Sequence, residues 1–195
     1  YLWGVLFIKR SRKISIQGDY LKKYFFSKEY LFSTAEYIRR IQRMRLEKIV
    51  QHAMTHSEFY RELYSNSGIS INNISEIQVT DLPIVDKQLV MDNFDSVVCD
   101  KLIKKEELLS FISNPENANS RFMGKYTVIH TSGSSGKLGL FVYDDKDINT
   151  INVLFSKYTF HLKPLFRMLM QRVVFLGAVN GHYAAYTSFS RFSDY

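Results

Sequence analysis

Apolar side chains between residues 33 and 53 recur at the three- and four-residue spacing of one helix face. Ser33 followed by Glu36 has the pattern of a capping box, so we expect a helix from here to about Ala53. The basic side chains fall mostly on the other side of this helix, and the apolar stripe is typical of a core face. The stripe consists of Ile38, Ile41, Leu46, Ile49, Val50 and Ala53.

Similar patterns predict shorter helices, and polar breaks predict the loops between them. We expect helices at Glu58–Ser65 (ending near Gly68), Asp86–Asn93, Lys104–Ile112 and Asp144–Lys163. Pro164 helps to end the last of these, and three aspartates, Asp144, Asp145 and Asp147, suit its N-terminal dipole. The same aspartates could suggest a metal site, but helix capping explains them. Loops are expected at Asn66–Asp81 and Ser113–Ser120.

Three segments rich in β-branched and aromatic residues predict strands. Tyr126–His130 and Leu140–Tyr143 flank a Ser/Gly loop, and Arg172–Ala178 has the apolar run of a buried strand in a mainly parallel sheet. The apolar Tyr1–Ile8 segment is too short to cross a bilayer, which needs about 20 residues, and is expected to be a buried helical turn. The fold class is therefore α/β. We expect a helical region at 1–113 and an α/β subdomain at 121–195.

Charge is unevenly distributed along the 195 residues, whose net charge is +7. Residues 1–64 hold 13 Lys/Arg against 6 Asp/Glu, whereas residues 65–195 hold 13 of each. No nucleic-acid-binding motif accompanies the excess, so nucleic acid is not an expected partner. The basic third is expected to be a solvated helix face, with peripheral contact to an anionic membrane, or contact with an acidic neighbour, as alternatives.

Cysteine and histidine give few signals of their own. Cys99 is the single cysteine, so no disulfide framework exists. A cytoplasmic location is therefore expected. If the basic third does contact a membrane, the protein would lie at the inner membrane as a peripheral protein. A nucleophilic role would need a nearby histidine, and none is close in sequence. His52, His56 and His161 have no metal-ligand spacing, and no metal site is predicted.

The loop between the first two predicted strands carries the clearest chemistry. It reads Thr131, Ser132, Gly133, Ser134, Ser135, Gly136 and Lys137. Glycine amides, hydroxyl donors and a lysine together favour binding of a nucleotide polyphosphate. The Walker pattern is excluded, because Thr131 stands where its first Gly belongs and Leu138 where its Ser or Thr belongs. A flexible Ser/Gly hairpin or linker is the alternative.

With its flanks, this loop resembles the phosphate loop of the adenylate-forming (AMP-binding) superfamily. The continuation Gly139–Asp144 is similar to the phenylacetate–CoA ligase branch and its CapK-like capsular-polysaccharide proteins, as are Ser57–Tyr64, Asp81–Lys87 and, more weakly, Val173–His182. The family more often has Thr at position 135 and Pro at 138, where this chain has Ser135 and Leu138, and Glu58 replaces a usual Pro.

The resemblance implies the large N-terminal domain of such an enzyme, a mixed sheet flanked by helices, with its phosphate loop at 131–139. It implies that the loop holds ATP phosphates, with Lys137 as the catalytic counter-charge, and that Gly181 and His182 rim the carboxylate pocket; for His182, a purely structural role stays equally open. Mg²⁺ and ATP would be required, and coenzyme A is an open acceptor.

The implied reaction converts a small carboxylate and ATP to an acyl-adenylate. The resemblance further suggests that the acyl group can pass on to a coenzyme A thioester, and that the protein acts in cell-surface polysaccharide synthesis. The family's later motifs are missing, so we expect an N-terminal fragment that is inactive alone. A catalytically inactive remnant or a basic membrane-associated binding module are the alternatives.

Overall fold

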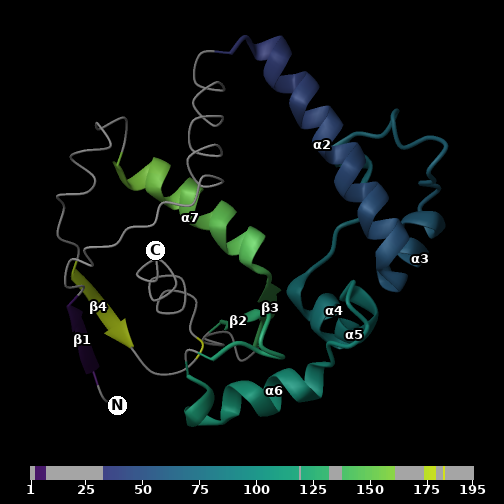
Figure 1. Cartoon of the computed structure of the whole chain (residues 1–195). Helices are drawn as coiled ribbons and strands as arrows, with labels where there is room; N and C mark the ends of the chain where they lie inside the picture. The colour runs from purple at the N-terminus through teal and green to yellow at the C-terminus, as the bar shows by residue number, and fades with distance from the viewer. Residues whose placement is uncertain are drawn as a thin grey trace. The chain divides into compact units, whose positions relative to one another are not determined.

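The protein combines helices with short antiparallel strands, so its fold is α/β in the broad sense (Figure 1). A computed structural model describes residues 3–7, 33–118, 120–131, 138–160, 174–178 and 182. These residues belong to two compact units. One holds residues 33–108, and the other holds strand β1 together with the described residues from 109 onward. The expected domain limits, 1–113 and 121–195, stay a prediction.

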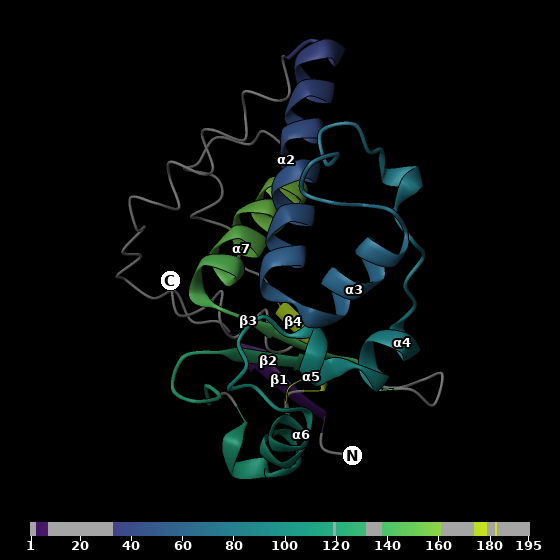
Figure 2. The same cartoon turned by 90° about the vertical axis from the view of Figure 1, so that its right-hand side faces the viewer.

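Helix α2 (Ala35–His56) is the longest element of the first unit, and α3 (Glu58–Asn66) packs against it (Figures 1 and 2). Thr34 caps α2 by accepting a 3.2 Å hydrogen bond from the Tyr37 amide, so the predicted start at Ser33 is wrong by one residue. Ser57 joins the two helices. Its amide donates to the Ala53 carbonyl at 2.9 Å, and its hydroxyl accepts from the Tyr60 amide at 3.3 Å.

The core of this unit forms where α2 and α3 meet the loop that follows. The apolar stripe on α2 is confirmed at Leu46, Val50 and Ala53, which belong to this cluster. Ile49 is 66% exposed, so its assignment to the stripe is wrong. The buried members are Val50, Met54, Tyr64, Ile69 and Ile77.

The end of α3 explains why the chain turns where the sequence predicts. Gly68 has φ of +77°, a conformation that glycine adopts without a steric cost. The Gly68 amide donates to the Ser65 carbonyl at 3.0 Å, and the Ile69 amide donates to the Tyr64 carbonyl at 2.9 Å. These two bonds form a Schellman cap. Ile69 and Tyr64 are both buried in the core, so the cap also fixes the direction in which the loop leaves.

Three further helices complete the chain up to residue 113. Helices α4 (Lys87–Asp92) and α6 (Lys105–Ser113) confirm the predictions within two residues, and Asp86 caps α4 through a 2.7 Å bond from the Leu89 amide. The intervening α5 (Phe94–Val97) is not predicted by the sequence pattern. The predicted loops are confirmed, although each contains a short 3-10 turn, at Val79–Asp81 and Pro115–Asn117.

Strand β1 (Trp3–Phe7) corrects the expectation of a helical turn at the start of the chain. It pairs antiparallel with β4 (Val174–Ala178), with Val5 opposite Leu176. The apolar run at Arg172–Ala178 therefore does contain a strand, but the observed pairing is antiparallel rather than parallel. An eight-residue apolar segment is too short to show the periodicity that distinguishes a helix from a strand. Pairing with β4 makes this segment a strand.

Strands β2 (Thr127–His130) and β3 (Leu140–Tyr143) form an antiparallel hairpin, as the sequence predicts, and α7 (Asp145–Phe160) follows β3. Val128 and Leu140 are buried at 0% and 3% exposure, which makes the hairpin part of a core. Among the described residues, no helix is long and apolar enough to cross a membrane.

Candidate functional site

The hairpin holds both ends of the predicted phosphate loop together. The Thr131 amide donates to the Gly139 carbonyl at 3.0 Å, and the Gly139 amide donates to the Thr131 hydroxyl oxygen at 2.9 Å. Gly139 is buried and Thr131 is half-buried. This pair of bonds, which we call the loop clamp, joins the two ends of the loop at the base of the hairpin. A strand–loop–strand arrangement also differs from the strand–loop–helix of a Walker site.

Of the predicted phosphate-binding residues, the structure places Thr131 alone. Ser132, Gly133, Ser134, Ser135, Gly136 and Lys137 lie outside the described residues, so their phosphate contacts, including the catalytic role of Lys137, stay predictions. Thr131 has an unexpected part in the loop clamp. Its hydroxyl oxygen accepts from Gly139, and the hydroxyl proton can still be donated to a ligand, because a hydroxyl is both donor and acceptor.

His182 lies beside the start of the loop although it is 51 positions after Thr131. Its carbonyl accepts a 2.9 Å hydrogen bond from the His130 amide, and its imidazole is 2% exposed. The ring packs against Phe111 with centroids 5.0 Å apart. The structure thus brings one of the two predicted pocket residues to the loop; Gly181 lies outside the described residues. Contact between His182 and a carboxylate stays a prediction.

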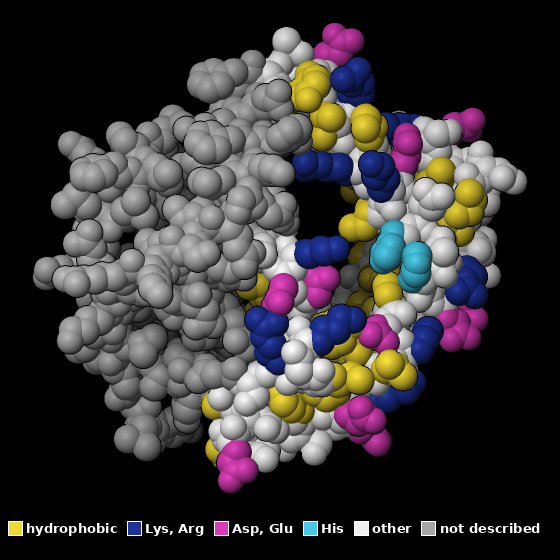
Figure 3. Space-filling model, viewed as in Figure 1, with side chains coloured by type: hydrophobic (Ala, Val, Ile, Leu, Met, Phe, Trp, Pro, Cys, Tyr) yellow, Lys and Arg dark blue, Asp and Glu magenta, His cyan; other side chains and the backbone are white. Residues whose placement is uncertain are grey.

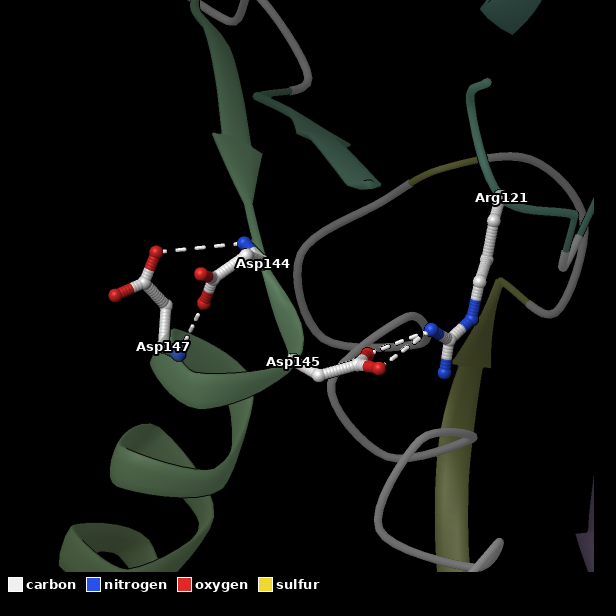
Figure 4. A network of polar contacts seen from close by, with 4 residues as sticks. All are labelled: Arg121, Asp144, Asp145 and Asp147. Carbon is white, nitrogen blue, oxygen red and sulfur yellow. Dashed lines mark hydrogen bonds and ion pairs between the residues drawn. The ribbon is translucent and has the colours of Figure 1, made fainter. Parts of the chain in front are cut away.

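The aspartates after β3 cap α7 and anchor it. Asp144 accepts from the Asp147 amide at 2.8 Å, and Asp147 accepts from the Asp144 amide at 3.3 Å, which is a reciprocal capping box (Figure 4). Asp145 forms a 2.7 Å ion pair with Arg121 (Figure 4). Burial, and then the negative charge of Asp147, raises the pKa of Tyr143. Capping thus accounts for Asp144 and Asp147, as the sequence predicts, whereas Asp145 pairs with Arg121. The described residues contain no cluster of three metal-ligating side chains.

A polar hollow of about 570 Å³ lies in the first unit, around α5 and the start of α6. Lys105 lines it, but both of its nitrogens serve the fold. Its amide donates to the Asp95 carboxylate at 2.8 Å, and its ammonium donates to the Met91 carbonyl at 2.6 Å. Lys105 is thus engaged in holding the fold, and we assign the hollow no role.

One contact between chemically active side chains is absent from the sequence predictions. His52 and Cys99 lie 47 positions apart, yet the Nε2 atom of His52 is 3.8 Å from the Sγ atom of Cys99. His52 also stacks on His56, with ring centroids 4.3 Å apart. The four-residue spacing of the two histidines, which puts both on one helix face, is the signal that could have drawn attention to this cluster.

Comparison with known proteins gives no assignment. No protein-family model, curated protein or solved structure matches the chain.

Proposed function

We propose that this chain belongs to an AMP-forming ligase, which joins a small carboxylate to ATP and releases pyrophosphate. The observation that carries the proposal is the loop clamp: two hydrogen bonds of 3.0 Å and 2.9 Å close a loop whose sequence is rich in glycine, hydroxyl groups and lysine. Joining the two ends of any segment restricts the arrangements that the segment can adopt. This restriction lowers the entropic cost of gripping a polyphosphate.

The chemistry asked of the loop is positioning and charge stabilisation. When the carboxylate attacks the α-phosphorus of ATP, negative charge builds up on the departing pyrophosphate. Amides at Gly133 and Gly136, hydroxyls of the serines and the Lys137 ammonium would stabilise this charge. Mg²⁺ would enter as the complex with ATP, and no described residue is assigned to it. These loop residues do not identify the nucleophile that accepts the acyl group after adenylation, which is coenzyme A or another nucleophile.

Calorimetric titration with Mg·ATP tests the phosphate assignment in the protein as its natural source encodes it. Lys137→Ala removes a charge-assisted hydrogen bond of about 1.5–3 kcal/mol, so the dissociation constant should rise about 10- to 150-fold. Lys146→Ala is the matched control, because Lys146 is exposed on the first turn of α7 and loses the same charge. Equal affinities for the two variants, or no binding by the unmodified protein, would contradict the proposal.

The exposed cations of α2 favour a second candidate, peripheral binding to an anionic membrane. Arg39, Arg40, Arg45 and Lys48 are all exposed. Such a surface should bind vesicles containing phosphatidylserine, and should do so less strongly as salt increases. Sedimentation with these vesicles should fall when Arg39 and Arg40 are both changed to Ala. Sedimentation that is independent of salt and of this change would eliminate the candidate.

A further inference from the structure

The contact between His52 and Cys99 has the dimensions of two ligands on one metal ion. Zn–S bonds are about 2.3 Å and Zn–N bonds about 2.0–2.1 Å, and an ion at these distances would join two atoms 3.8 Å apart at an angle of about 120°. This angle is close to the tetrahedral value. Both side chains are exposed, His52 on α2 and Cys99 shortly after α5, so an ion can reach them from solvent.

The contact made by His56 shows which of its two ring nitrogens has the lone pair that a third ligand needs. Its Nδ1 atom is 3.0 Å from the His52 carbonyl oxygen. Because a carbonyl only accepts hydrogen bonds, Nδ1 carries the proton, and the lone pair of the neutral ring is on Nε2.

The three side chains do not yet converge, since the described residues hold no group of three metal-ligating side chains. The His56 ring instead stacks on His52 at an interplanar angle of 24°. It is exposed and one helical turn from His52, so rotation about its side-chain bonds, which gives up the contact of Nδ1 with the His52 carbonyl, can bring Nε2 toward an ion held by the other two. Figure 3 shows two histidine side chains next to each other at the surface.

We propose that His52, His56 and Cys99 form a binding site for a borderline-soft divalent ion such as Zn²⁺, with water as the fourth ligand. A thiolate with two imidazoles selects Zn²⁺ over Mg²⁺ or Ca²⁺, which prefer oxygen ligands. Binding replaces the thiol proton by the metal, so one proton leaves and one S–metal bond forms. In the metal-free protein the same two atoms lie 3.8 Å apart. This site is independent of the phosphate loop and of the proposed ligase activity.

Titration of the reduced chain with Co²⁺, followed by competition with Zn²⁺, tests the site. Cys99 is the only cysteine in the sequence, so a thiolate-to-cobalt charge-transfer band reports on this position alone. We expect one equivalent of Co²⁺ to produce the band and one equivalent of Zn²⁺ to remove it. Cys99→Ser should abolish the band, and His52→Ala should weaken Zn²⁺ binding by more than about 100-fold, because loss of outer-shell partners alone costs about 10- to 100-fold.

Two further variants separate the third ligand from general effects of substitution on α2. His56→Ala should keep the band and lower the affinity by about tenfold or more. Gln51→Ala, an exposed substitution on the same helix, should leave both unchanged. A missing thiolate band in the unmodified chain, or Zn²⁺ affinities that Cys99→Ser and His52→Ala do not alter, would overturn the site. Unaltered affinity in His56→Ala would overturn the assignment of the third ligand.

Discussion

The loop clamp can be tested by replacing Thr131 with Val, which keeps the side-chain shape and removes the hydroxyl. The buried Gly139 amide would then lose its 2.9 Å acceptor. A buried donor left without a partner costs about 1–3 kcal/mol. Because the bond closes the base of the loop, we expect the cost to appear there as easier local opening. The Gly139 amide should exchange its hydrogen with solvent about 5- to 150-fold faster, as measured by hydrogen exchange in NMR spectra.

Thr131→Ser is the matched control, because serine keeps the accepting oxygen and loses only the methyl group. Its Gly139 amide should exchange within about twofold of the unmodified protein. The amide of Val128, a buried residue of β2 away from the clamp, should respond little in either variant. If Thr131→Val leaves the Gly139 exchange rate unchanged, the hydroxyl does not hold the loop, and the structural support for the phosphate loop is lost.

Other consequences of the structure concern stability. Asp144→Ala removes the capping box of α7 and should lower the free energy of unfolding in urea by about 1 kcal/mol, whereas Asp144→Ser should retain most of it. Met123 has φ of +53° in an exposed turn, so Met123→Gly should stabilise the fold by up to about 1 kcal/mol, and a loss of stability would contradict this. Burial raises the pKa of Tyr64 above its ordinary 10.0, so its contribution to stability is complete below pH 10 and is lost as pH rises through the higher folded value. Tyr64→Phe should reduce this alkaline loss in urea unfolding measured above pH 9, and an identical pH dependence would refute it.

Sequence patterns predicted the elements whose local signals agree with one another. Strands β2 and β3 have β-branched and aromatic residues around a glycine-rich break, and the observed hairpin follows directly. Gly68 ends α3 because its backbone conformation suits glycine, and Asp86 and Asp144 precede helices as their side chains suggest. In each case the deciding interaction is within a few residues of the position that predicts it.

Predictions failed where distant parts of the chain decide the outcome. Trp3–Phe7 is a strand because β4, more than 160 positions later, supplies its hydrogen-bond partners. Helix α5 is a single turn of four residues, too short to show a helical period. The contact of His52 with Cys99 depends on how α2, α3 and α5 pack, so two residues 47 positions apart gave no sign of it in the sequence.

The central claim, an AMP-forming ligase, is tested most directly by carboxylate-dependent exchange of pyrophosphate into ATP, measured on the protein as its source encodes it. A panel of small carboxylates should include at least one that supports exchange, because adenylation is reversible while the acyl-adenylate stays bound. Lys137→Ala should slow that exchange about 100-fold or more, while Lys146→Ala should leave it within about twofold. Exchange at the same rate in both variants, or ATP cleaved to ADP and phosphate in place of AMP and pyrophosphate, would contradict the claim.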